Sequence, residues 1–283
     1  MSRGALVREL LYRDKPVLMG ILNVTPDSFS DGGQNDSAAA AIAHAGSMAA
    51  QGADIIDVGG ESTRPGAAPV SEAEQMQRVL PAIEGIRGGS GPAAEHVISI
   101  DTRSARVAEA ALAAGADLIN DVSAGADPAM FEVAARHGVP IALMHMQGTP
   151  ETMQDNPSYE DAVGEITDYL LSRAAAAQAA GVAKADIVID PGIGFGKSRA
   201  HNLALIRHLD HFVATGYPVL LGASRKRFMG AICEETVFSE LVGATCATTA
   251  LGVAAGVRLF RVHDIKENRQ AADVAWAVGP AQR

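Results

Sequence analysis

Polar residues follow short apolar runs at eight places along this chain of 283 residues. The runs are rich in Val, Ile and Leu, as in PVLMGIL before Asn23, VISI before Asp101 and DIVI before Asp190. The other residues in such positions are Asp57, Asn120 with Asp121, His145, Ser224 with Arg225 and Lys226, and Arg261 with His263 and Asp264. Such side chains bind ligands and move protons. Their repeated position predicts one face of the molecule that is built for chemistry.

Asp101, Asn120, Asp190 and Lys226 form the first candidate set, because they follow four different apolar runs. A carboxylate accepts two parallel N–H bonds from an amidine-like edge, and an asparagine amide both donates and accepts. A lysine ammonium adds a donor for carbonyl oxygens or ring nitrogens. This combination predicts a flat, nitrogen-rich heterocycle as the ligand. The alternative for Asp101 or Asp190 taken alone is a helix cap, because Asp is a favoured N-cap residue.

Arg64, Arg261 and His263 form a second, cationic set. Arg261 and His263 alternate within LFRVHD, so both point to one side of a strand there. Arginine is the preferred residue for two-pronged contacts to phosphate. Because the chain carries a net charge of −10, cations gathered on one face predict a bound anion. A Schiff-base role for Lys226 is disfavoured, because it lies in SRKR, beyond the apolar run where such a lysine is expected.

Oxygen-bearing side chains near the first apolar run predict a Mg²⁺ site. Asn23 ends that run, and Asp27 and Asp31 follow it closely. Mg²⁺ takes few protein ligands and completes its shell with water and phosphate oxygens. His208 and His211 lie one helical turn apart, but an ordinary surface position explains them better than a metal site.

The glycine-rich segment 192–198 matches neither common phosphate-binding motif. A P-loop requires Gly at the position of Pro191, and the dinucleotide pattern requires Gly at the position of Lys197. The segment is therefore predicted to be a tight turn after a strand. In such a turn, glycines let backbone N–H groups approach a flat ligand closely.

Composition restricts the possible function classes. The net charge of −10 argues against a general binder of nucleic acids or membrane surfaces. The first residues contain too short an apolar run for a signal peptide, and no run approaches the roughly 18 apolar residues of a membrane span. Cys233 and Cys246 form no disulfide framework, as expected for a protein of the reducing cytoplasm.

The apolar runs alternate with helical segments. Strands are expected near residues 17–22, 53–58, 97–101, 117–121, 139–144, 186–190, 217–222 and 257–262. Short, non-alternating Val/Ile/Leu runs are typical of strands buried on both faces of a parallel sheet. Helices are expected over 37–52, 159–180, 239–255 and 265–278, with N-caps at Ser71 and Asp127 and a loop over 85–95.

Eight β-then-α units in a chain of this length predict an α/β fold, the (β/α)8 or TIM barrel. A doubly wound sheet is the alternative. No linker-like tract divides the chain, so residues 1–283 are expected to form a single domain, with 1–15 as an N-terminal extension. In a barrel, the polar strand ends and the long loops NVTPDSFSDGGQND and GGESTRPGAAPV lie at the carboxyl-terminal face, where ligands bind.

Eight segments resemble, in order, the motifs of the dihydropteroate synthases, a family of folate-pathway enzymes. These segments are GILNVTPDSFSDGG, DVGGESTRPG, SIDT, IND, MHMQGTP, DPGIGFGK, SRK and RVHD. The match covers nearly the whole chain. The resemblance implies a (β/α)8 barrel that condenses (7,8-dihydropterin-6-yl)methyl diphosphate with 4-aminobenzoate to 7,8-dihydropteroate and diphosphate, with Mg²⁺ as cofactor.

The resemblance also implies roles for the candidate residues. The pterin-binding set is Asp101, Asn120, Asp190 and Lys226. The diphosphate and Mg²⁺ end is formed by Asn23, Arg261 and His263, with Thr63 and Arg64 close to the same anion. The wall of the aminobenzoate site is formed by Phe29, Pro65, Phe195 and Ser224. Catalysis is expected to involve Asp101, Asp190, Lys226, Arg261 and His263.

In this family diphosphate leaves first, and the arylamine then attacks a pterin-methyl cation while mobile loops exclude water. Asp57, Asp121 and Asp264 are expected to act as supports or caps, and His145 has no evident partner. A homodimer is expected by resemblance. The stretch ICEETVFSELVGATCATTA departs from the family pattern, and this departure concerns the dimer interface more than catalysis.

Two other functions compete with the synthase. A pterin-dependent methyltransferase on the same barrel shares the pterin set but lacks the diphosphate end, so Arg261, His263 and NVTPDSFSDGG argue against it. An inactive pterin-binding paralogue is expected to carry damaged loops, and those of this chain are intact in sequence.

Overall fold

A computed structural model describes residues 3–24, 34–62 and 69–279. In these residues one sheet contains eight parallel strands in the order β6-β5-β4-β3-β2-β1-β8-β7. The strands are β1 (Val17–Asn23), β2 (Ile55–Gly59), β3 (Val97–Asp101), β4 (Leu118–Asp121), β5 (Ile141–Met144), β6 (Ile187–Asp190), β7 (Leu220–Leu221) and β8 (Leu259–Val262). Every predicted strand is therefore present.

The two edge strands of this order meet, so the sheet closes on itself. Ile189 of β6 and Val219, just before β7, form a parallel bridge. The Ile189 amide also donates to the Pro218 carbonyl oxygen at 3.0 Å. β7 is shorter than expected, because proline has no N–H with which to extend the ladder. The closed ring confirms the barrel and excludes the doubly wound sheet.

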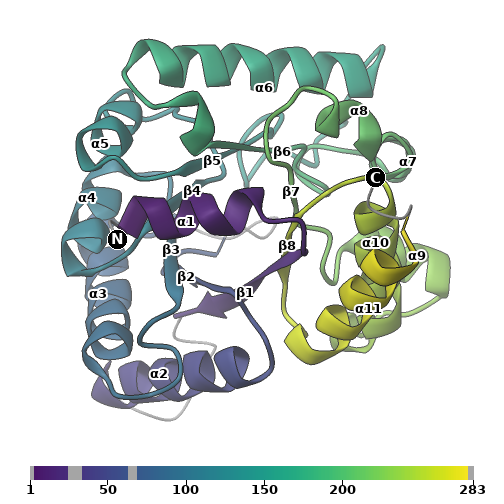
Figure 1. The fold of residues 1–283 in the computed structure, drawn as a ribbon. Coiled ribbons are helices and arrows are strands. Elements are labelled where there is room, and N and C mark those ends of the chain that lie inside the picture. Colours follow the sequence, from purple (N-terminus) through teal and green to yellow (C-terminus); the bar gives the residue numbers. More distant parts are fainter. Residues whose placement is uncertain (1–2, 25–33, 63–68, 280–283) are drawn as a thin grey trace.

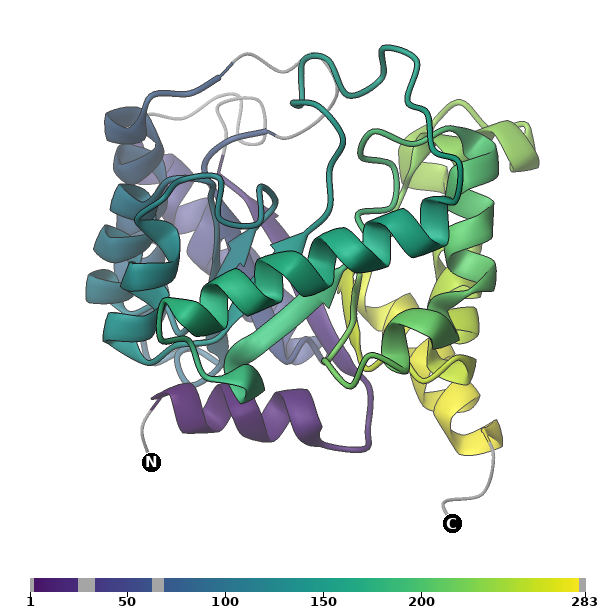
Figure 2. The same ribbon diagram turned by 90° about the horizontal axis from the view of Figure 1, so that it is seen from above.

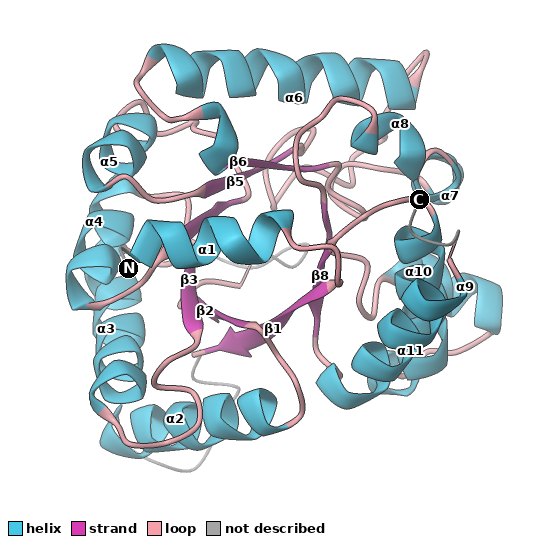
Figure 3. Ribbon diagram, viewed as in Figure 1, coloured by secondary structure: helices cyan, strands magenta, loops and turns pink. Residues whose placement is uncertain are grey.

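Helices surround the ring of strands (Figures 1 and 3). Following the chain, the helices are α1 (Arg3–Tyr12), α2 (Gln34–Ala50), α3 (Glu72–Gly88), α4 (Ala105–Ala114), α5 (Met130–His137), α6 (Ala162–Ala179), α7 (Arg199–Arg207), α8 (Leu209–Val213), α9 (Arg227–Cys233), α10 (Val242–Ala254) and α11 (Ile265–Val278). Two short 3₁₀ turns, Lys184–Asp186 and Phe238–Glu240, lie before β6 and α10. No helix in the described ranges is long and apolar enough to cross a membrane.

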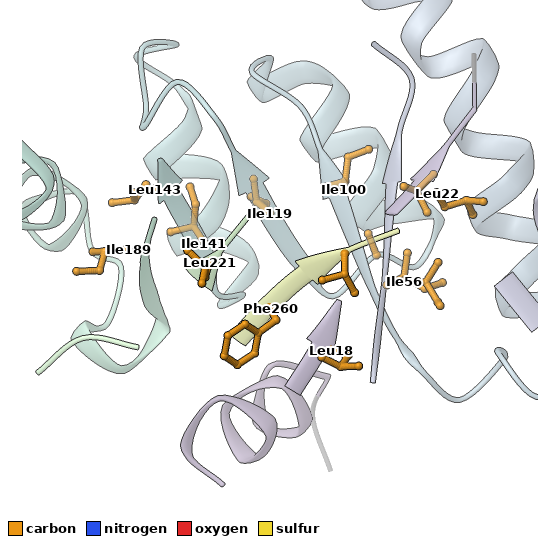
Figure 4. Close-up of a cluster of buried hydrophobic side chains, with 14 of the residues drawn as sticks. Leu18, Leu22, Ile56, Ile100, Ile119, Ile141, Leu143, Ile189, Leu221 and Phe260 are labelled. Atoms are coloured by element: carbon orange, nitrogen blue, oxygen red, sulfur yellow. The ribbon is translucent and has the colours of Figure 1, made fainter. Parts of the chain in front are cut away.

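Alternation along each strand divides the core into two layers. Leu18, Ile56, Ile100 and Ile189 point outward and pack against the helices (Figure 4). The next residues along the strands point inward and fill the barrel, where they form a separate cluster: Val17, Met19, Ile55, Val97, Leu118, Ala142, Val188, Leu220 and Leu259. Each buried Leu, Ile or Val contributes roughly 1.5–3 kcal/mol. The inner apolar layer makes the amino-terminal half of the barrel a packed core.

Helix α1 closes the amino-terminal end of the barrel. Val7 and Leu11 are buried and belong to the same cluster as the inward strand residues. Arg8 Nη2 donates to Asp186 Oδ2 at 2.6 Å, which fastens the helix to the turn before β6. Figure 2 shows α1 on one side of the strands and the loop between β5 and α6 on the other. Ligand chemistry is thus restricted to the carboxyl-terminal end.

The expected helix boundaries are partly confirmed. Ser71 caps α3, since its side chain accepts from the Glu74 amide at 3.3 Å. Asp127 does not cap α5, which begins only at Met130 with Ala129 as N-cap. Asp127 Oδ1 nevertheless accepts from the Ala129 amide at 3.0 Å, a cap-type bond in the turn that leads into α5. Its Oδ2 accepts from the Ala105 amide at 2.8 Å, at the start of α4. The first N–H groups of α4 have no partner within their own helix. The sequence around Asp127 does not show that they lie close by.

The segment 85–95 was predicted to be a loop, and its first residues prove to be helical. Helix α3 continues to Gly88. Arg87 in its last turn donates to the carbonyl oxygens of Ala94 at 2.6 Å and His96 at 3.0 Å. These bonds hold the short connection to β3 close to the helix end, on the side of the barrel opposite the polar strand ends.

Candidate active site

Strand register brings polar side chains together at the carboxyl-terminal mouth of the barrel. Asn23 pairs with Gly59, Gly59 with Asp101, and Asp101 with Asn120. On the far side of the ring, Met144 pairs with Asp190. Asn23, Asp101 and Asn120 are thus neighbours across β1 to β4, and Asp190 is the last residue of β6. Together they form a polar layer at the carboxyl ends of the strands, above the inner apolar core.

Arg261 connects three members of this layer. Its Nε donates to Asp57 Oδ2 at 2.6 Å, and its Nη2 donates to Asp101 Oδ2 at 2.7 Å. Asn120 Nδ2 also donates to Asp57 Oδ2, at 3.2 Å. Asp57, which was expected to be a support, is completely buried and orients both Arg261 and Asn120. Arg261 itself was assigned to the anion end, yet here it lies within the predicted pterin set.

In this network, burial and ion pairing shift the pKa values of the charged groups in opposite directions. Burial raises the pKa of Asp101 to about 7, although the Arg261 guanidinium lowers it. Burial also lowers the pKa of Arg261, but the charges of Asp57 and Asp101 outweigh that effect and leave it raised. Two buried carboxylates around one guanidinium therefore make a site that attracts cationic or N–H-rich groups.

Asp190 faces the same mouth from β6. Its Oδ1 accepts from the Gly192 amide at 2.7 Å. Its Oδ2 lies 3.7 Å from the place where a Cβ at Gly222 would stand, so glycine in that position leaves room beside the carboxylate. Burial raises the pKa of Asp190 to about 6, while the Gly192 bond and nearby Lys226 lower it.

Lys226 lies over an aromatic ring. Its Nζ is 4.0 Å from the centroid of Phe195, a cation–π contact. A Cβ at Gly194 would stand 3.0 Å from Lys226 Cδ, so glycine allows the loop to approach the lysine stem. Lys226 and Phe195 were assigned to the pterin and aminobenzoate sites separately, and they lie side by side.

Ser224 and His263 form a further contact, between the ends of β7 and β8. Ser224 Oγ accepts from the His263 backbone amide at 3.2 Å and lies 2.9 Å from His263 Nδ1. Behind them, Arg225 Nε donates to Asp264 Oδ2 at 3.0 Å. This ion pair joins the same two loops, so Asp264 is a support.

His145 has a partner that the sequence pattern did not reveal. Its Nδ1 lies 3.0 Å from Lys197 Nζ, and both side chains are buried. Burial and then the charge of Lys197 lower the pKa of His145 to about 3, which favours a neutral ring whose Nδ1 accepts the bond. Lys197 ends the motif GIGFGK and could have indicated a partner for His145. From the sequence, however, it only excluded the dinucleotide-binding pattern.

Some candidates lie outside the described residues. They are Phe29, Thr63, Arg64 and Pro65, together with the possible metal ligands Asp27 and Asp31. Their proposed roles remain predictions. His208 and His211 are described, and both are exposed, as expected for surface histidines.

The fold and the mouth together define a class of protein, a barrel enzyme with a polar site at the carboxyl ends of its strands. The chain matches the family described as pterin binding enzyme over residues 19–263. It is 47% identical over 272 residues to a dihydropteroate synthase of Neisseria meningitidis serogroup B, covering 94% of each chain. It is 44% identical over 262 residues to the Escherichia coli dihydropteroate synthase, covering 93% of this chain and 91% of the relative.

Solved structures agree with these relatives. A Xanthomonas albilineans dihydropteroate synthase with 4-aminobenzoic acid matches with a TM-score of 0.86 and 44% identity, covering 94% of this chain and 93% of the other. The same organism's enzyme in complex with 7,8-dihydropteroate matches with a TM-score of 0.84 and 40% identity, covering 95% and 97%. The chain belongs to the dihydropteroate synthase family of pterin-binding enzymes.

Proposed function

We propose that this chain is a transferase that condenses (7,8-dihydropterin-6-yl)methyl diphosphate with 4-aminobenzoate, giving 7,8-dihydropteroate and diphosphate for folate synthesis. The observation that carries the proposal is the layer of Asp101, Asn120 and Asp190 at the mouth of the barrel, with Lys226 beside it. The 4-aminobenzoic acid and 7,8-dihydropteroate bound to related structures support the two substrates.

The pterin ring is recognised by complementary hydrogen bonds. Asp101 and Asp190 accept from the amino-pyrimidine edge of the pterin, and Lys226 donates to its carbonyl oxygen or a ring nitrogen. Asn120 is held by Asp57, and this bond fixes the orientation of its amide. The buried surroundings strengthen each of these bonds, because little water competes.

The reaction needs no nucleophile from the protein. The bond between the pterin methylene carbon and a diphosphate oxygen breaks, and both electrons leave with diphosphate. The remaining cation is delocalised over the pterin ring and is stabilised by the carboxylates of Asp101 and Asp190. The amine of 4-aminobenzoate then donates its lone pair to the methylene carbon and releases a proton. Preorganised groups of this kind contribute about 3 kcal/mol each.

Arg261 and His263 stand at the end of β8, where the diphosphate is expected. The Arg261 guanidinium is already bonded to Asp57 and Asp101. It therefore acts on the diphosphate as a fixed charge within the network rather than as a free side chain. Ser224 Oγ bonds both the His263 backbone amide and His263 Nδ1, which holds the imidazole in place at the end of β8.

Asn23 suits a Mg²⁺ ion by chemistry and by position. Its Oδ1 lies 3.7 Å from the place of a missing Cβ at Gly59, as does Asp101 Oδ2, so glycine keeps both oxygen atoms in an uncrowded position at the mouth. No group of three or more His, Cys, Asp or Glu in the described ranges could hold a metal alone. Substrate phosphate oxygens would complete the shell, and the bound ion would neutralise charge on the departing diphosphate.

Purified protein with Mg²⁺ is expected to release diphosphate only when both substrates are present. A coupled assay for diphosphate, with each substrate omitted in turn, measures this directly. Tight pterin binding without turnover would identify an inactive paralogue instead. Transfer of a methyl group from a methylated pterin, with no diphosphate released, would identify the methyltransferase.

Removal of the metal is expected to abolish diphosphate release, and added Mg²⁺ should restore it. Replacing Asn23 with Ala should raise the Mg²⁺ concentration that gives half-maximal activity by roughly 10- to 100-fold, since a ligand is lost. A titration of activity against Mg²⁺ measures the shift. Full activity in excess chelator would rule out a metal requirement.

We also propose that the protein is a cytoplasmic homodimer that joins through α10 and α11. These helices line an apolar groove that includes Val242, Ala250 and Ala271. Leu251 and Val274 on the same helices are 57% and 64% exposed. An apolar face of this kind marks a protein interface, and a two-fold axis would pair it with its own copy. The free thiols of the described cysteines are compatible with the reducing cytoplasm.

Replacing Val274 with Asp is expected to convert the dimer to a monomer, because a charge would be buried at the centre of the interface. Light scattering after size-exclusion chromatography should show wild-type protein at twice the chain mass of 29.2 kDa and the variant at 29.2 kDa. Leu171→Asp, on an exposed position of α6, is the matched control and should remain dimeric. A wild-type monomer at micromolar concentration would contradict the proposal.

A further inference from the structure

The loop between β6 and α7 is pressed against its neighbours at three glycines. A Cβ at Gly192 would stand 1.9 Å from the His145 carbonyl oxygen, and one at Gly196 would stand 2.5 Å from the Gln147 carbonyl oxygen. Gly194 meets the stem of Lys226 in the same way. All three glycines have positive φ angles, which residues with a side chain rarely adopt. The loop therefore has one position, set against the end of β5 and against Lys226.

Lys197 fixes this loop through hydrogen bonds from its side chain. Its Nζ donates to the Phe195 carbonyl oxygen at 2.8 Å and to the His145 carbonyl oxygen at 3.3 Å. The same nitrogen contacts His145 Nδ1 at 3.0 Å. Every donor of the ammonium thus points to an acceptor on the loop itself or on the end of β5. The result is a direct connection from β5 to the backbone of Phe195, whose ring lies under Lys226.

Burying the Lys197 ammonium group costs free energy, which argues against a role in stability alone. The residue is 3% exposed, and none of the three acceptors is a carboxylate. Burial lowers the pKa of Lys197 to about 7, although Asp190 raises it. Lysines are seldom buried without a charged partner. Costly groups of this kind are typical of functional sites.

We propose that Lys197 is a positioning residue for the synthase reaction, which fixes the Phe195 ring and thereby the surface that receives 4-aminobenzoate beside Lys226. The inference rests on the proposed function. Lys197 does not touch substrate. It acts through the backbone of Phe195, and a loss of its bonds leaves the ring free to move away from the ammonium it supports.

The test is the kinetics of Lys197→Met, which keeps the length of the side chain and removes its donors. The Michaelis constant for 4-aminobenzoate, measured at saturating pterin diphosphate, should rise on the order of tenfold, while kcat changes less than about threefold. A purely structural role would lower the active fraction, and so kcat, without moving the Michaelis constant. Thermal unfolding of the variant verifies that the protein is folded.

Two further variants separate positioning from general loop stability. Tyr159→Phe removes a 2.7 Å bond to the Gly196 carbonyl oxygen in the same loop, and it should leave the Michaelis constant within about twofold. In a Phe195→Leu background, Lys197→Met should raise the Michaelis constant for 4-aminobenzoate by a further factor of less than about two, because both changes act on one ring. A full tenfold effect in that background would overturn the proposal, and so would an equal effect of Tyr159→Phe.

Failure of this inference can be told apart from failure of the proposed function. Active wild-type protein whose Michaelis constant is unchanged in Lys197→Met overturns only the role of Lys197. Wild-type protein that releases no diphosphate overturns both. If Lys197→Met does not fold, Lys197→Gln replaces it with the same expectations, and failure of both to fold would assign Lys197 to folding and overturn its positioning role.

Discussion

Replacing Arg261 with Met is expected to lower the free energy of unfolding by about 3–5 kcal/mol, the cost of leaving buried carboxylates without their cation. Arg261 bonds both Asp57, which is fully buried, and Asp101. Chemical denaturation of wild-type and variant protein measures the difference. Catalysis should be lost as well, since Arg261 orients Asp57 and Asp101 at the proposed pterin site.

The decrease in the free energy of unfolding caused by Arg261→Met should grow as the pH rises from 6 to 8. Burial raises the pKa of Asp101 and Arg261 lowers it, so without Arg261 the native state keeps Asp101 protonated at a pH where the unfolded chain has released that proton. Stability falls with rising pH wherever the native state binds more protons than the unfolded state. An effect that is independent of pH would contradict this account.

A double variant and a surface control complete the experiment. Arg261→Met combined with Asp57→Asn should be less destabilising than the sum of the single changes, because the stranded charge is removed with its partner. Arg136, which pairs with Glu109 in an exposed position, serves as the control. Arg136→Met should cost less than about 1 kcal/mol. Strictly additive losses at Arg261 and Asp57 would mean that the two residues do not act as a pair.

Replacing Asp190 with Asn is expected to weaken pterin binding by roughly 10- to 150-fold, the equivalent of one charge-assisted hydrogen bond. The carboxylate lies buried at the mouth, with one oxygen held by Gly192. Fluorescence titration with a pterin measures the affinity at pH 8, where the wild-type carboxylate is ionised. Binding that is unchanged would remove Asp190 from the pterin site.

The pH dependence of this affinity identifies the carboxylate. Burial raises the pKa of Asp190 to about 6, so the group is protonated below that pH and loses its charge and an acceptor site. Wild-type affinity should therefore fall in two stages, near pH 7 as Asp101 is protonated and near pH 6 as Asp190 is protonated. Asp190→Asn should lack the stage near pH 6 and keep the stage near pH 7. Asp101→Asn is the control and should keep the stage near pH 6. A variant without Asp190 that still shows the stage near pH 6 would assign the titration to another group.

Most of the fold was predictable from local pattern. Eight apolar runs of the length and composition of buried parallel strands all became strands, and α11 has the predicted boundaries. The errors arose where a distant segment intervened. Asp127 bonds the start of α4 as well as the turn before α5, and Pro218 shortens β7 although the run around it is apolar. Local sequence cannot show which neighbouring segment offers an unpaired backbone group.

The candidate site was predictable as a set of residues but not as a set of contacts. Alternation along strands and the position of polar residues at strand ends were enough to select Asp101, Asn120, Asp190 and Lys226, since side-chain direction has a period of two. The family resemblance added Phe195, Ser224 and the loop residues. No pattern indicated that Arg261 would lie between Asp57 and Asp101, or that His145 would accept from Lys197.

The amino-acid sequence by itself determined the barrel, the carboxyl-terminal location of the polar residues and the family. These depend on periodicity, composition and motif, which are local properties of the chain. Only the tertiary structure decided the partners, because closure of the ring sets which side chains meet inside the barrel. Arg261 and Asp57 are 204 residues apart in the chain and 2.6 Å apart in the barrel. Their pairing, and the raised pKa that the carboxylate charges give Arg261 against the effect of burial, exist only once the sheet has closed.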